Sequence, residues 1–164
     1  MALRKASAYS KKKARPFTRI SRSKSKAYIK VTPYSKVVKL TMGNAQDYKL
    51  GKHKFAVKLI SGENVKIRDN ALESARMHLH KQLEEKIPGQ YYWLLKVYPH
   101  HFLRENKTAA GAGADRLSSG MKHSYGIVIG RAAFVKNGQE IFVVFCEDDR
   151  DARIEETQIG RAHV

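Results

Sequence analysis

Short stretches of alternating apolar and polar residues divide the middle of the chain into predicted strands. Over residues 55–60 apolar side chains alternate with lysine and alanine, which is the period-two pattern of a half-buried strand. A second strand is predicted over residues 65–68, after a turn at Gly62. A β-branched run over residues 37–42 predicts an earlier strand. The pattern therefore favours neighbouring strands before the first long helix.

The clearest helix is predicted to begin after Asn70 and to end at Ile87-Pro88-Gly89. Asn70 is a good N-cap residue, and Glu73 three positions later completes a capping-box pattern. One apolar stripe follows at helical spacing: Leu72, Ala75, Leu79 and Leu83. The opposite face carries Arg76, His80 and Lys81, so we expect that it can also meet RNA.

Three further strands are predicted after this helix. Residues 91–98 are aromatic and aliphatic and end at Pro99, and residues 125–135 and 140–146 are also apolar. Asn137-Gly138 between the last two is typical of a type I′ hairpin turn. The acidic residues that follow Cys146 predict the start of a second helix. Because regular helices do not separate the strands, we predict an α+β fold with a mostly antiparallel sheet.

Residues 100–124 have no clear strand or helix pattern and are predicted to form one long loop. The segment is rich in glycine and alanine, and its charged residues are mainly basic. Long loops without structure of their own are usually functional or disordered. We therefore expect a flexible, basic loop that is thin enough to enter a crevice in RNA.

The charge distribution changes this picture from a plain α+β domain to a polyanion-binding one. The chain of 164 residues has 32 Lys and Arg against 15 Asp and Glu, a net charge of +17. Residues 1–46 contain 13 of these bases and no acid. Such a segment neutralises phosphates and releases counterions, and its interleaved aromatic residues can pack on sugars or unstacked bases. The partner is expected to be a nucleic acid, with an acidic membrane surface as the alternative.

The candidate RNA-binding residues of this extension are its bases up to residue 30. They are Arg4, Lys5, Lys11, Lys12, Lys13, Arg15, Arg19, Arg22, Lys24, Lys26 and Lys30. A transit peptide has a similar composition. Lys11 to Lys13 and Pro16 interrupt any amphipathic helix there, so the nucleic-acid arm is favoured.

Other function classes find little support in the sequence. A single cysteine, Cys146, excludes a disulfide framework, and we expect it to be a small buried residue. The chain contains no apolar run long enough for a membrane span and no apolar signal core. His100 and His101 are adjacent without a set of further ligands, so we expect partly exposed histidines rather than a metal site. No catalytic constellation, cofactor motif or nucleotide-binding loop is predicted.

Two motifs carry a resemblance to a known family. Residues 99–107, 111–116 and 120–121 (PHHFLRENK, GAGADR and GM) and the helix start over 68–76 (RDNALESAR) resemble the large-subunit ribosomal proteins called L-ten-e in archaea, the universal L-sixteen family. The likeness covers roughly residues 15–150 and has the archaeal and eukaryotic form of the loop.

The resemblance implies a non-catalytic component of the cytoplasmic ribosome, with an antiparallel sheet sandwiched with two helices. Its partners would be large-subunit ribosomal RNA, neighbouring ribosomal proteins and, by proximity, A-site tRNA; no homo-oligomer is expected. The loop would point towards the peptidyl transferase centre. The residues matched to it are Arg104, Asn106, Lys107, Gly111, Gly113, Arg116 and Lys122.

We therefore divide the chain into a basic RNA-binding extension (residues 1–33), an α+β domain (34–156) and a tail (157–164). The tail fits neither the helix pattern nor the family. We expect it to be non-native, a read-through of sequencing-adapter DNA, the alternative being a naturally shortened end. A basic ribosome-associated or RNA-processing factor that shares the fold remains the alternative function.

Overall fold

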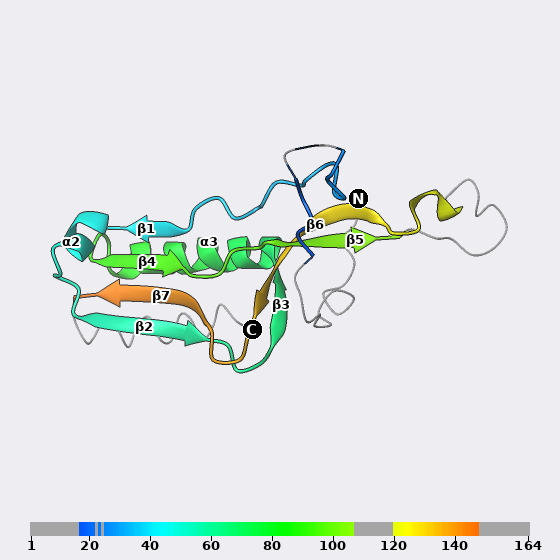
Figure 1. Cartoon of the computed structure of the whole chain (residues 1–164). Helices are drawn as coiled ribbons and strands as arrows, with labels where there is room; N and C mark the ends of the chain where they lie inside the picture. Colours follow the sequence, from blue (N-terminus) through cyan, green and yellow to red (C-terminus); the bar gives the residue numbers. More distant parts are fainter. Residues whose placement is uncertain (1–16, 22, 24, 107–119, 148–164) are drawn as a thin grey trace.

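The computed structural model contains two antiparallel sheets and one long helix (Figure 1). It describes residues 17–21, 23, 25–106 and 120–147. The larger sheet has the order β1 (Thr41–Gly43), β4 (Tyr91–Leu95), β7 (Glu140–Cys146) and β2 (Phe55–Ile60). The smaller sheet has the order β3 (Val65–Arg68), β6 (Ile127–Val135) and β5 (His101–Glu105). The helical elements are α2 (Ala45–Lys49), α3 (Asp69–Lys86) and the 3-10 turn η1 (Gly120–His123). The predicted α+β, antiparallel fold class is confirmed.

The hydrophobic core lies between α3 and one face of the larger sheet (Figure 1). Alternate residues of β4 are buried, and Trp93 at its centre is fully enclosed. The predicted stripe of α3 is confirmed: Leu72, Leu79 and Leu83 are buried and Ala75 packs against them. Side chains alternate between faces along a strand and return to one face every 3.6 residues along a helix, so these buried positions agree with the sequence pattern.

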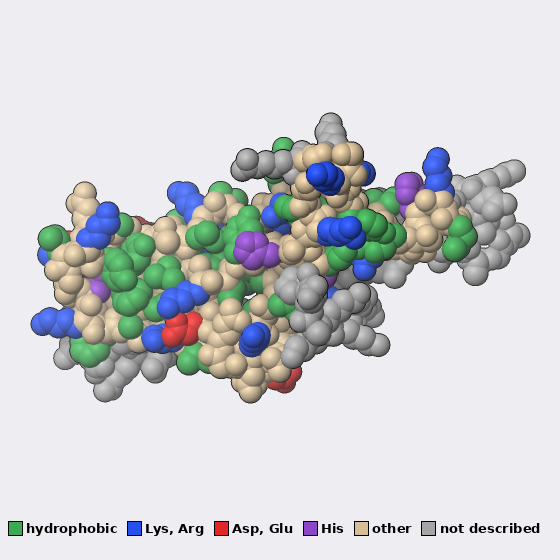
Figure 2. Space-filling view, viewed as in Figure 1, with side chains coloured by type: hydrophobic (Ala, Val, Ile, Leu, Met, Phe, Trp, Pro, Cys, Tyr) green, Lys and Arg blue, Asp and Glu red, His purple; other side chains and the backbone are tan. Residues whose placement is uncertain are grey.

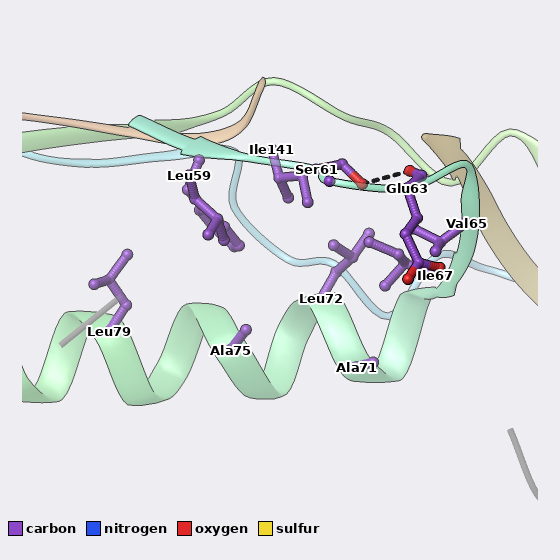
Figure 3. A pocket seen from close by; sticks show the side chains of 12 residues that line it. Leu59, Ser61, Glu63, Val65, Ile67, Ala71, Leu72, Ala75, Leu79 and Ile141 are labelled. Atoms are coloured by element: carbon purple, nitrogen blue, oxygen red, sulfur yellow. Dashed lines mark hydrogen bonds between the residues drawn. The ribbon is translucent and has the colours of Figure 1, made fainter. Parts of the chain in front are cut away.

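An apolar groove of about 580 Å³ continues from the core, between α3 and the end of β2 and β3 (Figure 3). Leu59, Ile67 and Leu79 are among its lining residues. At its rim the Ser61 hydroxyl donates to the Glu63 carbonyl at 2.7 Å.

The second helix predicted after Cys146 lies outside the described residues.

The predicted capping of the long helix is wrong. The helix begins at Asp69, and Arg68 precedes it without a side-chain cap. Asp69 accepts hydrogen bonds from the backbone N–H groups of Asn70 and Lys36, and Glu73 accepts one from Val38. These contacts also explain why the predicted strand over 37–42 is short. Backbone donors at 36 and 38 bind carboxylates of α3, so regular pairing with β4 starts only at β1.

The predicted two-residue hairpin between β6 and β7 is also wrong. These strands belong to different sheets, and the chain turns between them at Lys136, whose carbonyl accepts a hydrogen bond from the Gln139 N–H. Gly138 has a φ of +78°, as expected, but Asn137 does not have a positive φ, which excludes a type I′ turn. The turn instead pairs with Ser61, which follows β2. The Gly138 N–H donates to the Ser61 carbonyl at 2.8 Å, and the Ser61 N–H donates to the Gln139 carbonyl at 3.0 Å.

The predicted structureless loop over 100–124 is wrong in its first part. Residues 101–105 form β5, which pairs with β6, and three of them are buried. Their partners on β6 lie between 22 and 31 positions away in the chain, beyond the reach of a local pattern. We call β5 and β6 the β5–β6 hairpin; it projects away from the larger sheet (Figure 1). The segment 107–119 lies outside the described residues.

Two other predicted strands are shorter or placed differently. The strand over 91–98 ends at Leu95, where the chain crosses to the smaller sheet. Residues 65–68 do form a strand, but it pairs with β6 rather than continuing β2. The strand over 55–60 and the buried position of Cys146 are confirmed.

Candidate nucleic-acid interface

The described part of the basic extension packs along the β5–β6 hairpin. The backbone N–H of Phe17 donates to Nδ1 of His101 at 2.6 Å, and the N–H of Phe102 donates to the Phe17 carbonyl at 2.9 Å. Ala27 and Ile29 are buried. The described part of the extension is therefore bound to β5, a strand that we had predicted to be part of a loop.

The predicted phosphate-binding residues of the extension divide into two groups. Arg19, Lys26 and Lys30 are described and all three are exposed. The others lie outside the described residues: Arg4, Lys5, Lys11, Lys12, Lys13, Arg15, Arg22 and Lys24. The exposed positions of the first group are suited to contact with a polyanion.

The predicted loop residues divide in the same way. Arg104 lies on β5 and is half-buried, Asn106 follows that strand and is exposed, and Lys122 is exposed in η1. Lys107, Gly111, Gly113 and Arg116 lie outside the described residues. Of the described members, Arg104 lies against Phe17 of the extension, whereas Lys122 lies in η1 ahead of β6.

Arg104 lies against aromatic rings from two other segments. Its guanidinium carbon is 3.7 Å from the centroid of the Tyr125 ring and 4.7 Å from that of Phe17. Tyr28 contacts both rings, and Arg19 lies 5.6 Å from the Tyr28 centroid. Burial raises the pKa of Tyr125, while the neighbouring Arg104 opposes that rise. Figure 2 shows basic side chains beside hydrophobic ones where the extension crosses the hairpin.

The α3 face that was expected to meet RNA is only partly exposed. Arg76 is buried, and its guanidinium pairs with Glu73 at 2.5 Å. This hydrogen-bonded ion pair raises the pKa of Arg76 and lowers that of Glu73. His80 lies 2.8 Å from the Tyr91 hydroxyl, whereas Lys81 is exposed. The prediction that Arg76 faces RNA is therefore wrong, because its charge is satisfied within the fold.

The prediction of exposed histidines holds for His100, which is exposed, but not for His101. His101 is buried, because it accepts the bond from Phe17 and packs 4.8 Å from the Phe134 ring. Within the described ranges, no group of three His, Cys, Asp or Glu side chains is arranged to hold a metal ion. Across the same ranges, no helix has the length and apolar character that crossing a membrane requires.

Sequence reasoning considered the aromatic residues of the extension and Arg104 separately and missed that Phe17, Tyr28 and Arg104 meet. Tyr125 was assigned only to a strand. No local signal links residues about a hundred positions apart, since their contact depends on the pairing of β5 with β6. The aromatic residues interleaved with the bases of the extension were the available hint.

Comparison with known families supplies the identity. Residues 13–162 match the model of the family described as ribosomal protein L16p/L10e. The chain belongs to this family. Its members are structural proteins and not enzymes, which agrees with the prediction of a non-catalytic chain.

Curated relatives agree with the family match, and those described here come from archaea. A large ribosomal subunit protein uL16 from Methanococcus maripaludis strain C7 is 45% identical over 145 residues, covering 88% of this chain and 78% of the relative. The protein of the same name from Hyperthermus butylicus is 40% identical over 145 residues, which also cover 88% of this chain and 78% of the relative. That from Natronomonas pharaonis is 37% identical over 132 residues, or 76% and 72% of the two chains.

Proposed function

We propose that this L16p/L10e protein is a structural constituent of the large ribosomal subunit in the cytoplasm and binds large-subunit ribosomal RNA. Its other partners are neighbouring ribosomal proteins and, by proximity, tRNA. The basic extension neutralises RNA phosphates. The segment 104–122 is directed towards the peptidyl transferase centre, near the A-site tRNA path. The protein acts as a single copy and without a cofactor.

The position of the charge is the observation that carries this proposal. Residues 1–46 hold 13 bases and no acid. The described bases of this region are exposed, and the extension runs beside the hairpin that bears Arg104 and Asn106. A basic strip next to a projecting hairpin suits binding to RNA on one side of the molecule.

Sedimentation tests the assignment to the ribosome. We expect the protein to remain with the large subunit through a high-salt wash, because an integral constituent is held by many phosphate and packing contacts at once. A ribosome-associated or RNA-processing factor, the alternative function, would be released by the same wash. Release of the protein would therefore overturn the structural assignment in favour of the factor.

Truncation of residues 1–16 tests the role of the extension. This removes Arg4, Lys5, Lys11, Lys12, Lys13 and Arg15. The slope of log K against log salt for single-stranded RNA should become shallower by about 0.7 for each phosphate that the shortened protein no longer neutralises. An unchanged slope would show that these bases do not contact RNA.

Arg116→Ala tests the loop. The change should leave the melting temperature of the isolated protein unchanged and impair tRNA accommodation by reconstituted subunits. Arginine offers a planar fork that suits a phosphate or a base edge. Normal translation by the variant subunits would contradict the assignment of this segment to the tRNA path.

A further inference from the structure

Three aromatic rings and one guanidinium meet where the extension crosses the β5–β6 hairpin. We call Phe17, Tyr28, Arg104 and Tyr125 the aromatic–arginine cluster. The ring centroids of Tyr28 and Tyr125 lie 4.4 Å apart, those of Phe17 and Tyr125 5.3 Å, and those of Phe17 and Tyr28 6.0 Å. Arg104 lies over Tyr125 and beside Phe17. The cluster thus joins three segments that are far apart in the sequence.

The cluster is open to solvent at its edge. Tyr28 is 46% exposed and Tyr125 is 36% exposed, which is high for rings that contact one another so closely. Arg19, also exposed, extends the basic surface on the Tyr28 side. A ligand can therefore reach the cluster without any rearrangement of the core.

Among the described residues, Arg104 and Arg131 differ from Arg76 in having neutral hydrogen-bond partners rather than a carboxylate. Arg76 pairs with Glu73, and Arg131 donates through Nε to the Pro33 carbonyl at 2.7 Å. Arg104 donates from Nη1 to the Tyr125 carbonyl at 3.2 Å. Among the residues that the structure describes, no carboxylate lies within ion-pair distance of its guanidinium. Most of its N–H donors thus remain available at the edge of the stack.

A guanidinium packed against aromatic rings is restrained, while its N–H groups can still donate to a ligand. Stacking on rings is a favourable cation–π interaction, and it restricts a side chain that otherwise loses much rotamer freedom when it binds. The remaining N–H groups form a planar fork, which matches two oxygens of a phosphate. A carboxylate from the protein would fill this fork, and none of the described ones does.

We propose that the aromatic–arginine cluster is a binding site for a phosphodiester group of RNA, with Arg104 as the donor and Phe17 and Tyr125 as positioning residues. The resemblance to the family gave Arg104 a place among the loop's RNA contacts. The cluster adds that a residue of the extension sets the orientation of this contact on the hairpin. Extension and hairpin then act as one RNA-binding unit. The proposal rests on the proposed function of RNA binding.

Charge-preserving substitutions in the full chain test the site. Arg104→Lys keeps the charge and loses the fork, while Phe17→Leu and Tyr125→Leu keep every charge and lose a ring. With fluorescein-labelled oligo(U) as the probe, anisotropy should show the dissociation constant rise about tenfold for each, as expected for one charge-assisted hydrogen-bonded contact. Tyr34→Leu is the matched control, because Tyr34 follows directly after the extension, is 94% exposed and lies outside the cluster. It should bind within about twofold of the unchanged protein.

Combination and rescue separate positioning from general loss of structure. If the rings act only through Arg104, the double variant of Arg104→Lys with Tyr125→Leu should bind no more weakly than the weaker single variant. Tyr125→Phe keeps the ring that Tyr125→Leu removes, so its dissociation constant should return to that of the unchanged protein. Thermal melting of every variant, compared at equal folded fraction, accounts for any loss of stability.

The outcomes distinguish this inference from the function on which it rests. Salt-independent binding, or none, by the unchanged protein would overturn the proposed RNA binding and the site with it. If the unchanged protein binds and truncation of residues 1–16 weakens it, while Arg104→Lys and Tyr125→Leu bind normally, only the site is overturned. Additive losses in the double variant would overturn the positioning role of the ring.

Discussion

The core beneath α3 and the junction between the extension and the hairpin are held together in different ways. In the core, Leu83, Trp93 and Val144 are completely buried, and burial of apolar surface is the main stabilising contribution. At the junction, rings that are more than a third exposed contact a guanidinium and each other. A core of this kind specifies the fold, whereas a junction of this kind keeps its chemistry accessible to a partner.

The treatment of arginine shows the same difference. Next to the core, Arg76 is paired with Glu73, and the pair also holds the segment before β1 through the Val38 N–H. At the junction, Arg104 has aromatic neighbours and no described carboxylate partner. The first arrangement satisfies a charge inside the protein, and the second leaves the charge without a carboxylate among the described residues.

The largest expected effect is the loss of a core side chain. Leu83→Ala should lower the free energy of unfolding by about 2–5 kcal/mol, because it removes buried methyl groups and leaves a cavity. Met77→Ala on the same helix is the control, since Met77 is 55% exposed, and it should change stability by less than about 0.5 kcal/mol. Urea denaturation measures both. Similar losses for the two variants would contradict the assigned face of α3.

A second large effect is expected at Gly43, where β1 approaches β4. Its φ is +99°, and a Cβ there would lie 2.3 Å from the Tyr91 carbonyl oxygen. Gly43→Ala should cost more than the 1–2 kcal/mol or so of a left-handed residue alone, because the two strands must also separate. Gly51→Ala isolates the conformational part, since Gly51 has a φ of +73° and open space around it. Equal melting temperatures for the two would show that the clash is relieved without cost.

This contrast also explains what could be predicted from the sequence. The stripe of α3, the strand over 55–60 and the burial of Cys146 follow from local periodicity, and all three are confirmed. They belong to the larger sheet and its helix, where one face of each element meets one core. Local pattern and tertiary environment agree there.

Predictions failed where long-range partners decide the structure. The backbone at 36 and 38 donates to carboxylates of α3 rather than to a strand. The segment 101–105 becomes a strand only because β6 lies beside it. Charge and family resemblance predicted several residues of the candidate site. They did not predict that aromatic rings of the extension pack against the hairpin, because those contacts join residues far apart in the chain.

The turn at Gly138 offers a smaller effect, at the place where the chain crosses from one sheet to the other. Gly138→Ala forces a side chain into a φ of +78° without any clash, so we expect a loss of about 1 kcal/mol in the free energy of unfolding. Gly62→Ala is the control on the facing segment, since Gly62 has no positive φ and no atom near its added Cβ. It should be neutral or slightly stabilising. An unchanged stability of Gly138→Ala would mean that the crossing readily adopts another turn.

The smallest expected effect concerns an ion-pair network on the larger sheet, in contrast to Arg104 at the junction, which has no carboxylate partner among the described residues. Glu140 contacts the amino groups of Lys58 at 2.7 Å and Lys96 at 2.6 Å. Hydrogen bonds from these two lysines lower the pKa of Glu140 to about 2. Since this folded-state pKa lies below the usual value of about 4.3 for glutamate, the stabilisation is present above that value. It is lost as the pH falls from about 4.3 towards 2. The melting temperatures of the unchanged protein and Glu140→Gln should therefore differ at neutral pH and converge in acid. High salt should reduce the difference in melting temperature at neutral pH, because both lysines are exposed and salt screens their attraction to Glu140. A difference that persists below pH 2 would show that Glu140 stabilises the sheet through packing rather than through its charge.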